Sequence, residues 1–443
     1  MSDTHHGLTP EQLASHWMPF TGNRQFKQDP RLMVSAEGRY YQDANGRNIF
    51  DGLSGLWTCG LGHSRAEINE AVAKQVKELD YSPAFQFGHP KSFELAHRIT
   101  QWMPQGLNRV FFTGSGSESV ETALKIARGY WRKQGQASKT RFIGRAKGYH
   151  GVNFGGISVG GISPNRAIYG QGIEAAHLPH TMIAENRFAK GSPADGAHLA
   201  DELENLIAIY DASTIAAVIV EPMAGSAGVI PPPQGYLKRL REICTKHNIL
   251  LIFDEVITAF GRVGAKTAAE EFDVIPDIMT TAKQLTNGVI PMGAVVAKQE
   301  IYDTFMEQGG PDYMLELPHG YTYSAHPVAC AAGLASLDLL EKEQLPQRVK
   351  TLAPKFEEML HGLKGTKHVA DIRNYGFAGA MTLDAKQGQP ALRPYEVAMN
   401  MWQKGFYVRY GGDTVQLGLP FTTELAEMDR LINALGDALN ETE

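Results

Sequence analysis

The chain has 443 residues, of which 43% are hydrophobic and 20% are charged, an ordinary composition for a globular protein. This length allows two or three domains, and a formal net charge of −6 without a basic block argues against general nucleic-acid binding. No apolar run approaches the roughly 20 residues that a membrane span requires, and no metal site is predicted.

The cysteine content and the first residues indicate a cellular location. Cys59, Cys244 and Cys330 are too few and too scattered for a disulfide framework, so each is expected to be a small buried residue in a reducing compartment. Residues 1–12 contain neither a basic region nor an apolar stretch, and no signal peptide is predicted. These features predict residence in the cytoplasm.

The N-terminal part is predicted to begin with a helix and to continue with short strands. Residues 39–50 are predicted to form a hairpin, because alternating strand residues flank an Asn45-Gly46 turn. Apolar residues then recur at helical spacing over residues 66–79.

Strands and helices alternate from about residue 108 to residue 325. The predicted strands are residues 110–112, 141–144, 215–221, 249–254 and 293–297, and the predicted helices are residues 117–134, 199–210 and 235–247. Such alternation is typical of a mostly parallel sheet covered by helices. Residues 58–325 are therefore predicted to form a large α/β domain.

The C-terminal part has a different pattern. Two long helices are predicted at residues 327–343 and 345–363, followed by strands around a helix near residues 394–405 and by a last helix that begins near residue 423. We interpret residues 326–443, together with residues 1–57, as a smaller α+β domain.

A loop of glycine and serine lies between the first strand of the large domain and the helix after it. Gly116 lets the backbone approach an anion, helix N–H groups bind phosphate oxygens, and the Ser115 and Ser117 hydroxyls add donors. A dinucleotide fingerprint would need a glycine in place of Ser119, and a P-loop lysine is missing. The loop therefore indicates a smaller phosphate group, or it is a plain capped turn.

Residues 147–151, with the sequence Lys-Gly-Tyr-His-Gly, form a second turn just past a predicted strand. Tyr149 on such a turn can stack on a flat ring, and the other interpretation is an aromatic anchor of a surface turn. We interpret His150, taken alone, as a structural histidine.

Asp254 ends an apolar strand at the edge where open α/β sheets place their ligands. An aspartate there can pair with a protonated pyridine nitrogen, or it can cap the next helix. If the extended conformation persists, Val256 shares the side of Asp254 and packs on the ring face opposite Tyr149. Glu255 then points away and serves the structure.

Lys283 lies downstream among small uncharged residues, between Ala282 and Gln284. Taken alone, it is either a solvated surface group or a lysine that holds a cofactor covalently and later moves a proton. A loop lysine beside an aspartate at a strand end is what a pyridoxal phosphate enzyme requires. The pair makes the chain a candidate for pyridoxal 5'-phosphate chemistry.

Together these motifs resemble the class III (ω-type) aminotransferases over residues 17 to about 421. The family's motifs occur in order at residues 114–118, 148–151, 254–256, 261–264, 282–283 and 320–324. Within the class, the β-alanine–pyruvate (ω-amino acid–pyruvate) branch is most similar, on residues 53–60, 81–90, 225–228 and 405–413. The resemblance implies a fold-type I homodimer with shared active sites, and it leaves a homotetramer open.

The resemblance also implies roles for single residues. Lys283 would be the catalytic residue that carries the cofactor, Asp254 would pair with the ring nitrogen, and Tyr149 and Val256 would contact the ring. The phosphate would be bound by Ser115, Gly116 and Ser117 of one subunit and by Thr322 of the other. The predicted substrate-binding residues are Trp57, Phe20, Phe85, Gln416 and Arg409, whose planar guanidinium would receive a carboxylate.

Two positions depart from common patterns in the family. Ile257 stands where many class III enzymes have a glutamine, and the β-alanine–pyruvate branch also has an apolar residue there. Ala259 stands where that branch commonly has glycine, so its methyl group either narrows the pocket or stiffens the turn.

The implied reaction is a ping-pong transfer of an amino group from β-alanine, another ω-amino acid or an amine to pyruvate, which leaves as L-alanine. The alternatives are an aminomutase or a decarboxylase on the same fold. A cofactor-binding regulator would need a fused DNA-binding domain, and none is predicted. A nucleotide-dependent dehydrogenase is disfavoured by the missing glycine.

Overall fold

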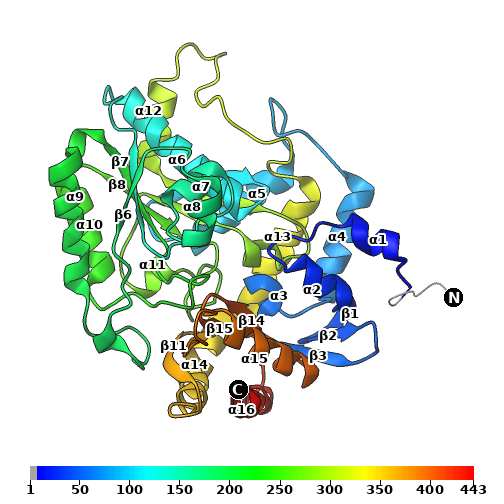
Figure 1. The fold of residues 1–443 in the computed structure, drawn as a ribbon. Coiled ribbons are helices and arrows are strands. Elements are labelled where there is room, and N and C mark those ends of the chain that lie inside the picture. The colour runs from blue at the N-terminus through cyan, green and yellow to red at the C-terminus, as the bar shows by residue number, and fades with distance from the viewer. Residues whose placement is uncertain (1–6) are drawn as a thin grey trace.

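The computed structural model describes residues 7–443 and has a seven-stranded central sheet in the order β4-β10-β9-β8-β7-β5-β6 (Figure 1). Its strands are β4 (Leu107–Thr113), β5 (Arg141–Arg145), β6 (Ala175–Leu178), β7 (Ile215–Val220), β8 (Leu250–Asp254), β9 (Ile278–Thr281) and β10 (Gly293–Lys298). β10 is antiparallel to both of its neighbours, and the other pairings are parallel. The predicted α/β fold with a mostly parallel sheet is thus confirmed.

Helices connect these strands and build much of the remaining molecule. They are α1 (Pro10–Ser15), α2 (Asn23–Gln28), α3 (Ser54–Trp57), α4 (Ala66–Glu78), α5 (Pro90–Trp102), α6 (Gly116–Lys133), α7 (Phe154–Val159), α8 (Ser163–Tyr169), α9 (Glu202–Tyr210), α10 (Tyr236–Lys246), α11 (Ala268–Glu271), α12 (Gln299–Glu307), α13 (Pro327–Lys342), α14 (Leu345–His361), α15 (Leu392–Gln403) and α16 (Leu425–Glu441). None of the helices within residues 7–443 has both the length and the apolar composition to cross a bilayer.

Helices lie on both faces of the central sheet, with α9 and α10 on one side and α6 on the other (Figure 1). Leu251 and Phe253 of β8 pack in the apolar cluster that contains α9 and α10, whereas Leu250 and Ile252 pack with α6. Because strand side chains alternate between faces, Asp254 continues on the α6 side. The hydrophobic pattern of β8 therefore decides which helix the Asp254 carboxylate faces.

Two four-stranded sheets are built from strands within residues 33–51 and residues 369–418. The first has the order β1 (Met33–Glu37), β2 (Tyr40–Asp43), β3 (Asn48–Asp51) and β13 (Phe406–Tyr407), and the second has the order β11 (Val369–Tyr375), β12 (Ala378–Leu383), β15 (Thr414–Gly418) and β14 (Arg409–Gly411). β13 runs parallel to β3, so the N-terminal hairpin shares a sheet with the C-terminal part. The predicted boundaries at residues 57 and 325 stay a prediction.

The strands β4, β5, β7, β8 and β9 run in the same direction, so their carboxyl ends meet at one edge of the central sheet. Beyond these ends lie the glycine-serine loop, the Tyr149 turn, Glu221, Asp254 and Lys283. Open α/β sheets bind their ligands at this edge. The strand order therefore brings the candidate functional motifs of the large domain together at this edge of the sheet.

Candidate active site

Asp254 is a nearly buried carboxylate, with 5% of its surface exposed. Its Oδ2 lies 2.8 Å from Nδ1 of His150, and its Oδ1 accepts hydrogen bonds from Thr280 Oγ1 at 3.1 Å and from the Val256 amide at 3.2 Å. A turn rather than a helix follows Asp254, so the carboxylate does not act as a helix cap. These contacts hold it in one orientation at the sheet edge.

His150 is more closely connected to this carboxylate than the sequence indicates. Its side chain is buried against Asp254, and its Nε2 has no hydrogen-bond partner among residues 7–443. Tyr149, which precedes it, is half-buried. Burial raises the pKa of Tyr149, the Arg409 guanidinium opposes this rise, and Asp254 adds to it.

Glu221 is a site residue that the sequence analysis does not identify. Val220 pairs with Phe253 across β7 and β8, which puts Glu221 beside Asp254 at the sheet edge. Its Oε1 accepts a hydrogen bond from the Tyr149 amide at 2.8 Å, and its Oε2 accepts one from the Gly225 amide at 3.1 Å. The available signal was a carboxylate directly after an all-apolar strand, the same pattern that identifies Asp254.

Lys283 follows β9, a four-residue strand that is not predicted from the sequence. The lysine begins a short 3₁₀ helix, Lys283–Thr286, rather than lying on a plain loop, and its φ of 47° is in the left-handed region. Burial of the amine lowers the pKa of Lys283 to about 8, while the Asp254 charge opposes this effect. The amine is therefore much closer to its neutral form at pH 7 than an ordinary lysine.

The lowered pKa leads to a direct prediction for the ligand-free protein. We expect acylation of Lys283 by an amine-reactive ester to increase with pH, with a midpoint near pH 8. The exposed Lys125 serves as the control for the activity of the reagent at each pH. Peptide mass spectrometry measures both sites in one sample. A midpoint for Lys283 well above pH 8 would contradict the lowered pKa of its amine.

The glycine-serine loop starts α6. The Ser115 hydroxyl is the helix cap and accepts a hydrogen bond from the Glu118 amide at 3.2 Å, while the Ser117 hydroxyl accepts one from the Val152 amide at 3.2 Å. Gly116 and Ser117 are the first two residues of the 18-residue helix. Their amides have no carbonyl partner in the preceding turn and are the type of group that binds phosphate.

Val256 contacts this loop, although it does not continue the strand. The extended conformation ends at Asp254 and Val256 begins a turn, so the condition under which Val256 would share the side of Asp254 is not met. A Cβ added to Gly116 would lie 2.9 Å from Val256 Cγ1 and 3.6 Å from Ala282 Cβ. Only glycine lets the start of α6 approach Val256 and the Lys283 turn this closely.

Glu255 points away from the site, as expected, and its hydrogen bonds connect the turn after Asp254 to the start of α11. Its carboxylate accepts hydrogen bonds from the amides of Ala268 at 2.6 Å and Ala269 at 2.8 Å, and from Thr258 Oγ1 at 2.9 Å. Burial raises the pKa of Glu255 to about 7, although these hydrogen bonds oppose the rise.

The predicted substrate residues Arg409, Gln416 and Trp57 come from distant parts of the chain. Arg409 pairs with Gln416 across β14 and β15, and its charge affects the pKa values of both Lys283 and Tyr149. Gln416 Oε1 and Trp57 Nε1 are buried without hydrogen-bond partners among residues 7–443. Buried polar groups normally have partners, so polar groups of a ligand or water would satisfy these two atoms.

Phe20, Phe85 and Thr322 do not join the buried cluster around Lys283. Phe20 is 75% exposed and Phe85 is 52% exposed, and Thr322 is also exposed. The loops of Phe85 and Thr322 contact each other, because the Tyr81 hydroxyl donates to the Thr322 carbonyl at 3.0 Å and a Cβ on Gly320 would lie 2.6 Å from the Phe85 ring. Within one chain, these three residues are therefore on the surface.

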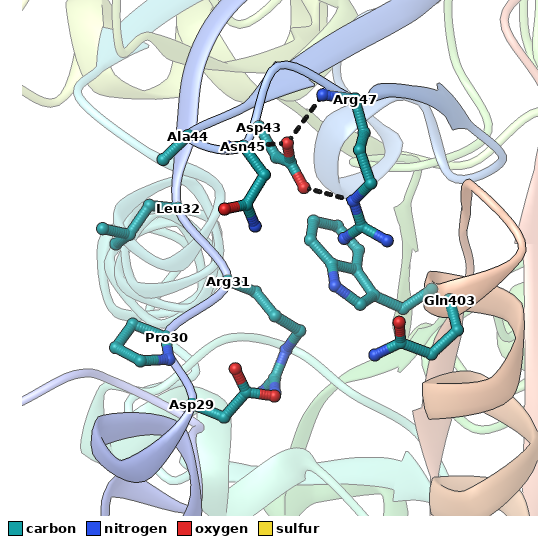
Figure 2. Close-up of a pocket in the computed structure, with 10 residues that line it drawn as sticks. Asp29, Pro30, Arg31, Leu32, Asp43, Ala44, Asn45, Arg47 and Gln403 are labelled. Carbon is teal, nitrogen blue, oxygen red and sulfur yellow. Dashed lines mark hydrogen bonds and ion pairs between the residues drawn. The ribbon is translucent and has the colours of Figure 1, made fainter. Parts of the chain in front are cut away.

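A separate cavity of about 350 Å³ lies between residues 29–32, the β2–β3 turn and the end of α15 (Figure 2). Arg47 donates from Nε to Asp43 Oδ2 at 2.8 Å in this cavity, and its guanidinium lies 5.4 Å from the centre of the Trp402 ring. None of the predicted site residues lines it. Because Lys283 and Asp254 lie elsewhere, we place the active site at the sheet edge.

The chain is similar to known proteins over nearly its whole length. Residues 21–439 match the family model described as aminotransferase class-III. The chain is 59% identical to the omega-amino acid–pyruvate aminotransferase of Pseudomonas putida and 59% identical to the beta-alanine–pyruvate aminotransferase of Pseudomonas aeruginosa, in both cases over 97% of this chain and 96% of the relative. An amine transaminase from an uncultivated Pseudomonas species, solved in a PLP-bound form, superposes with a TM-score of 0.88 at 37% identity, over 96% of this chain and 98% of that chain.

Proposed function

The chain belongs to the class III aminotransferase family, and from this premise we propose that it transfers the amino group of β-alanine, another ω-amino acid or an amine to pyruvate, giving L-alanine. It is a pyridoxal phosphate-dependent enzyme. The observation that carries the proposal is the position of Lys283 and Asp254 at the ends of adjacent parallel strands, beside the start of α6.

The residues at the sheet edge fit this cofactor. The first amides of α6 are free to bind a phosphate, Asp254 offers a fixed carboxylate to a protonated ring nitrogen, and Lys283 offers an amine. Gly116 leaves room where a Cβ would contact Val256. When bound, pyridoxal phosphate supplies an electron-withdrawing ring that stabilises negative charge on the carbon next to the amino nitrogen.

The residues of the chain supply covalent attachment, charge and proton transfer. Lys283 would hold the cofactor through Nζ and, as a free amine, would take a proton from the substrate carbon that bears nitrogen. A pKa of about 8 suits this role, because a base works best when its pKa is near the working pH. Asp254 keeps the ring nitrogen protonated, and His150, Thr280 and the Val256 amide hold its two oxygens in place.

Arg409 is proposed to bind the carboxylate of pyruvate and of ω-amino acids. A guanidinium binds a carboxylate with two parallel hydrogen bonds, which also orients the substrate. In β-alanine the carboxylate is one carbon further from the reacting carbon than in alanine, so one arginine must serve two geometries. Gln416 Oε1 and Trp57 Nε1, which are buried without partners among residues 7–443, are proposed to supply further polar contacts to the substrate.

A homodimer with shared active sites explains the exposed positions of Thr322, Phe85 and Phe20. We propose that the Thr322 loop of one subunit binds the phosphate in the other subunit, and that the exposed aromatic residues complete its pocket. Sedimentation or mass photometry of the holoenzyme distinguishes a dimer from a tetramer. A monomer with full activity would contradict the shared site.

Residence in the cytoplasm remains a prediction from the cysteine content.

The experiment that tests the proposed function is a donor panel with pyruvate as acceptor. The enzyme with pyridoxal phosphate is expected to form L-alanine from β-alanine, longer ω-amino acids or amines, measured by chromatography. Turnover without pyruvate, or release of carbon dioxide, would instead indicate an aminomutase or a decarboxylase.

In the same assay, the change Arg409→Lys is expected to raise the KM for pyruvate by about 10- to 100-fold, the effect of losing a hydrogen bond to a charged group. The half-reaction with an amine that lacks a carboxylate should keep its rate, because that donor does not use the guanidinium. An equal loss for both kinds of donor would argue against a carboxylate site at Arg409.

A further inference from the structure

The turn that carries Trp57 has an unusual backbone. Ser54, Gly55 and Trp57 have φ values of 50°, 67° and 66°. Ser54 and Trp57 are not glycines, so this left-handed conformation is strained and persists only where the surroundings enforce it. The groups that enforce it therefore decide where the Trp57 indole lies.

Asp51 is the main anchor of this turn. Its carboxylate is fully buried and accepts hydrogen bonds from the Gly55 amide at 2.6 Å and from the Leu53 amide at 3.2 Å. A second contact holds Ser54, which lies between these two residues: its Oγ donates to the Gly418 carbonyl at 2.6 Å. The carboxylate thus pairs with two amides at the start of the turn, while the amides of Trp57 and Thr58 donate to the carbonyls of Leu53 and Ser54 at 3.0 Å and 2.8 Å.

His63 completes the anchor. Its Nε2 lies 2.7 Å from Asp51 Oδ2, the oxygen that also binds the Gly55 amide. Burial lowers the pKa of His63, but hydrogen bonds to Asp51 and Cys59 outweigh this effect and raise it to about 9. At neutral pH the pair is therefore an imidazolium and a carboxylate.

The other titratable and charged groups near this pair are few within the described part of the chain. The Tyr41 ring lies 4.4 Å from the His63 ring, and the Cys59 thiol contacts the imidazole. Tyr41, Tyr407 and Arg262 each interact electrostatically with Asp51. Burial raises the pKa of Tyr407 to about 12 and that of Tyr41 further still, so neither phenol ionises near pH 9.

The anchored segment is fastened to the Lys283 turn. The Gly60 amide donates to Gln284 Oε1 at 2.7 Å, and the Leu61 amide donates to Asn287 Oδ1 at 3.0 Å. The Trp57 indole packs on Gly418, where a Cβ would lie 2.5 Å from the ring. These two hydrogen bonds hold Gly60 and Leu61 in place, so a rearrangement confined to residues 54–57 would move the indole without moving the Lys283 turn.

We propose that Asp51 and His63 are positioning residues for Trp57: their ion pair holds the strained turn that presents the indole to the amine-donor pocket, and it thereby restricts which donors fit. The inference rests on the proposed function, because it requires that Trp57 line that pocket. Breaking the pair lets the indole leave Gly418 and relaxes the limit on bulky donors.

The test compares His63→Gln with His247→Gln. His247 is a matched control, since its Nε2 lies 2.7 Å from the Glu204 carboxylate, far along the chain from Trp57. We expect His63→Gln to raise the ratio of kcat/KM for 1-phenylethylamine to kcat/KM for β-alanine by about tenfold, the effect of one hydrogen bond to a charged group. The control should keep the wild-type ratio.

The pH dependence of this ratio is the second readout, and it needs no variant. The pair is intact below the His63 pKa and is lost as the pH rises through about 9, so the wild-type ratio should rise there. His63→Gln should show a high ratio at every pH. Steps common to both donors, including proton transfer by Lys283, cancel in the ratio.

A third readout does not depend on turnover. The fluorescence difference between the wild type and Trp57→Phe reports the surroundings of this indole, and it should change between pH 7.5 and 10 in the holoenzyme. A constant difference spectrum together with a pH-independent ratio would overturn the positioning role. Absence of alanine formation by the wild type would instead overturn the proposed function, and the fluorescence would still decide the role of the pair.

Discussion

The change Lys283→Ala is expected to lower transaminase turnover by at least about 10²- to 10⁴-fold, the range that loss of a positioned proton-transfer group costs. The structure gives two reasons for so large an effect. Lys283 is proposed as both the covalent attachment point and the base, and its lowered pKa of about 8 makes its neutral amine available near neutral pH. The nearest charged neighbours, Asp254 and Arg409, cannot replace an amine in either role.

Borohydride reduction of the holoenzyme provides a readout that does not depend on turnover. The wild type should retain the cofactor covalently on the peptide that contains Lys283, and Lys283→Ala should retain none. The exposed Lys125→Ala protein is the matched control and should behave as the wild type. If the alanine variant kept full turnover, or if another lysine carried the label, the assignment of Lys283 would be wrong.

The sequence predicted five of the seven strands of the central sheet, all except β6 and β9, and it singled out the two residues to which we assign the cofactor chemistry. The continuous apolar run before Asp254 predicts a strand buried on both faces, and the carboxylate after it predicts a functional edge. Glu221 follows a similar run and sits beside Asp254, yet the sequence analysis leaves its role unassigned. A carboxylate at a strand end is informative only when the strand order is known, because neighbours in the sheet are not neighbours in the chain.

The walls of the pocket could not be predicted by local pattern. Trp57 packs on Gly418, which joins two segments at opposite ends of the chain, and the pairing of Arg409 with Gln416 within the small sheet does not by itself indicate that Arg409 lies near Lys283. The turn of Trp57 is held by Asp51, and no periodicity or spacing rule indicates a left-handed tryptophan. The resemblance to the family therefore predicted that Trp57 and Arg409 belong to the substrate pocket, and the structure shows which contacts hold them.

The change Asp254→Asn should lower kcat by about 10²- to 10³-fold, the cost of removing one preorganised electrostatic partner from an active site. Asparagine has nearly the same shape, and its oxygen can still accept the hydrogen bonds from Thr280 and the Val256 amide. It carries no negative charge, however, and its amide nitrogen would face His150 Nδ1 in place of Oδ2. The ring nitrogen would then lose the group that favours its protonation, and the cofactor should bind more weakly.

In the ligand-free protein, the effect of Asp254→Asn on Lys283 can be measured directly by the acylation of this lysine. The Asp254 charge favours the protonated amine of Lys283, so its removal should lower the pKa of Lys283 below about 8 and move the acylation midpoint to lower pH. Asp201→Asn removes an exposed carboxylate that pairs with Arg239 on the surface and should leave the midpoint unchanged. An unchanged midpoint in Asp254→Asn would mean that the two groups do not interact. In that case the pairing of an aspartate and a lysine at adjacent strand ends would not account for the chemistry of this site.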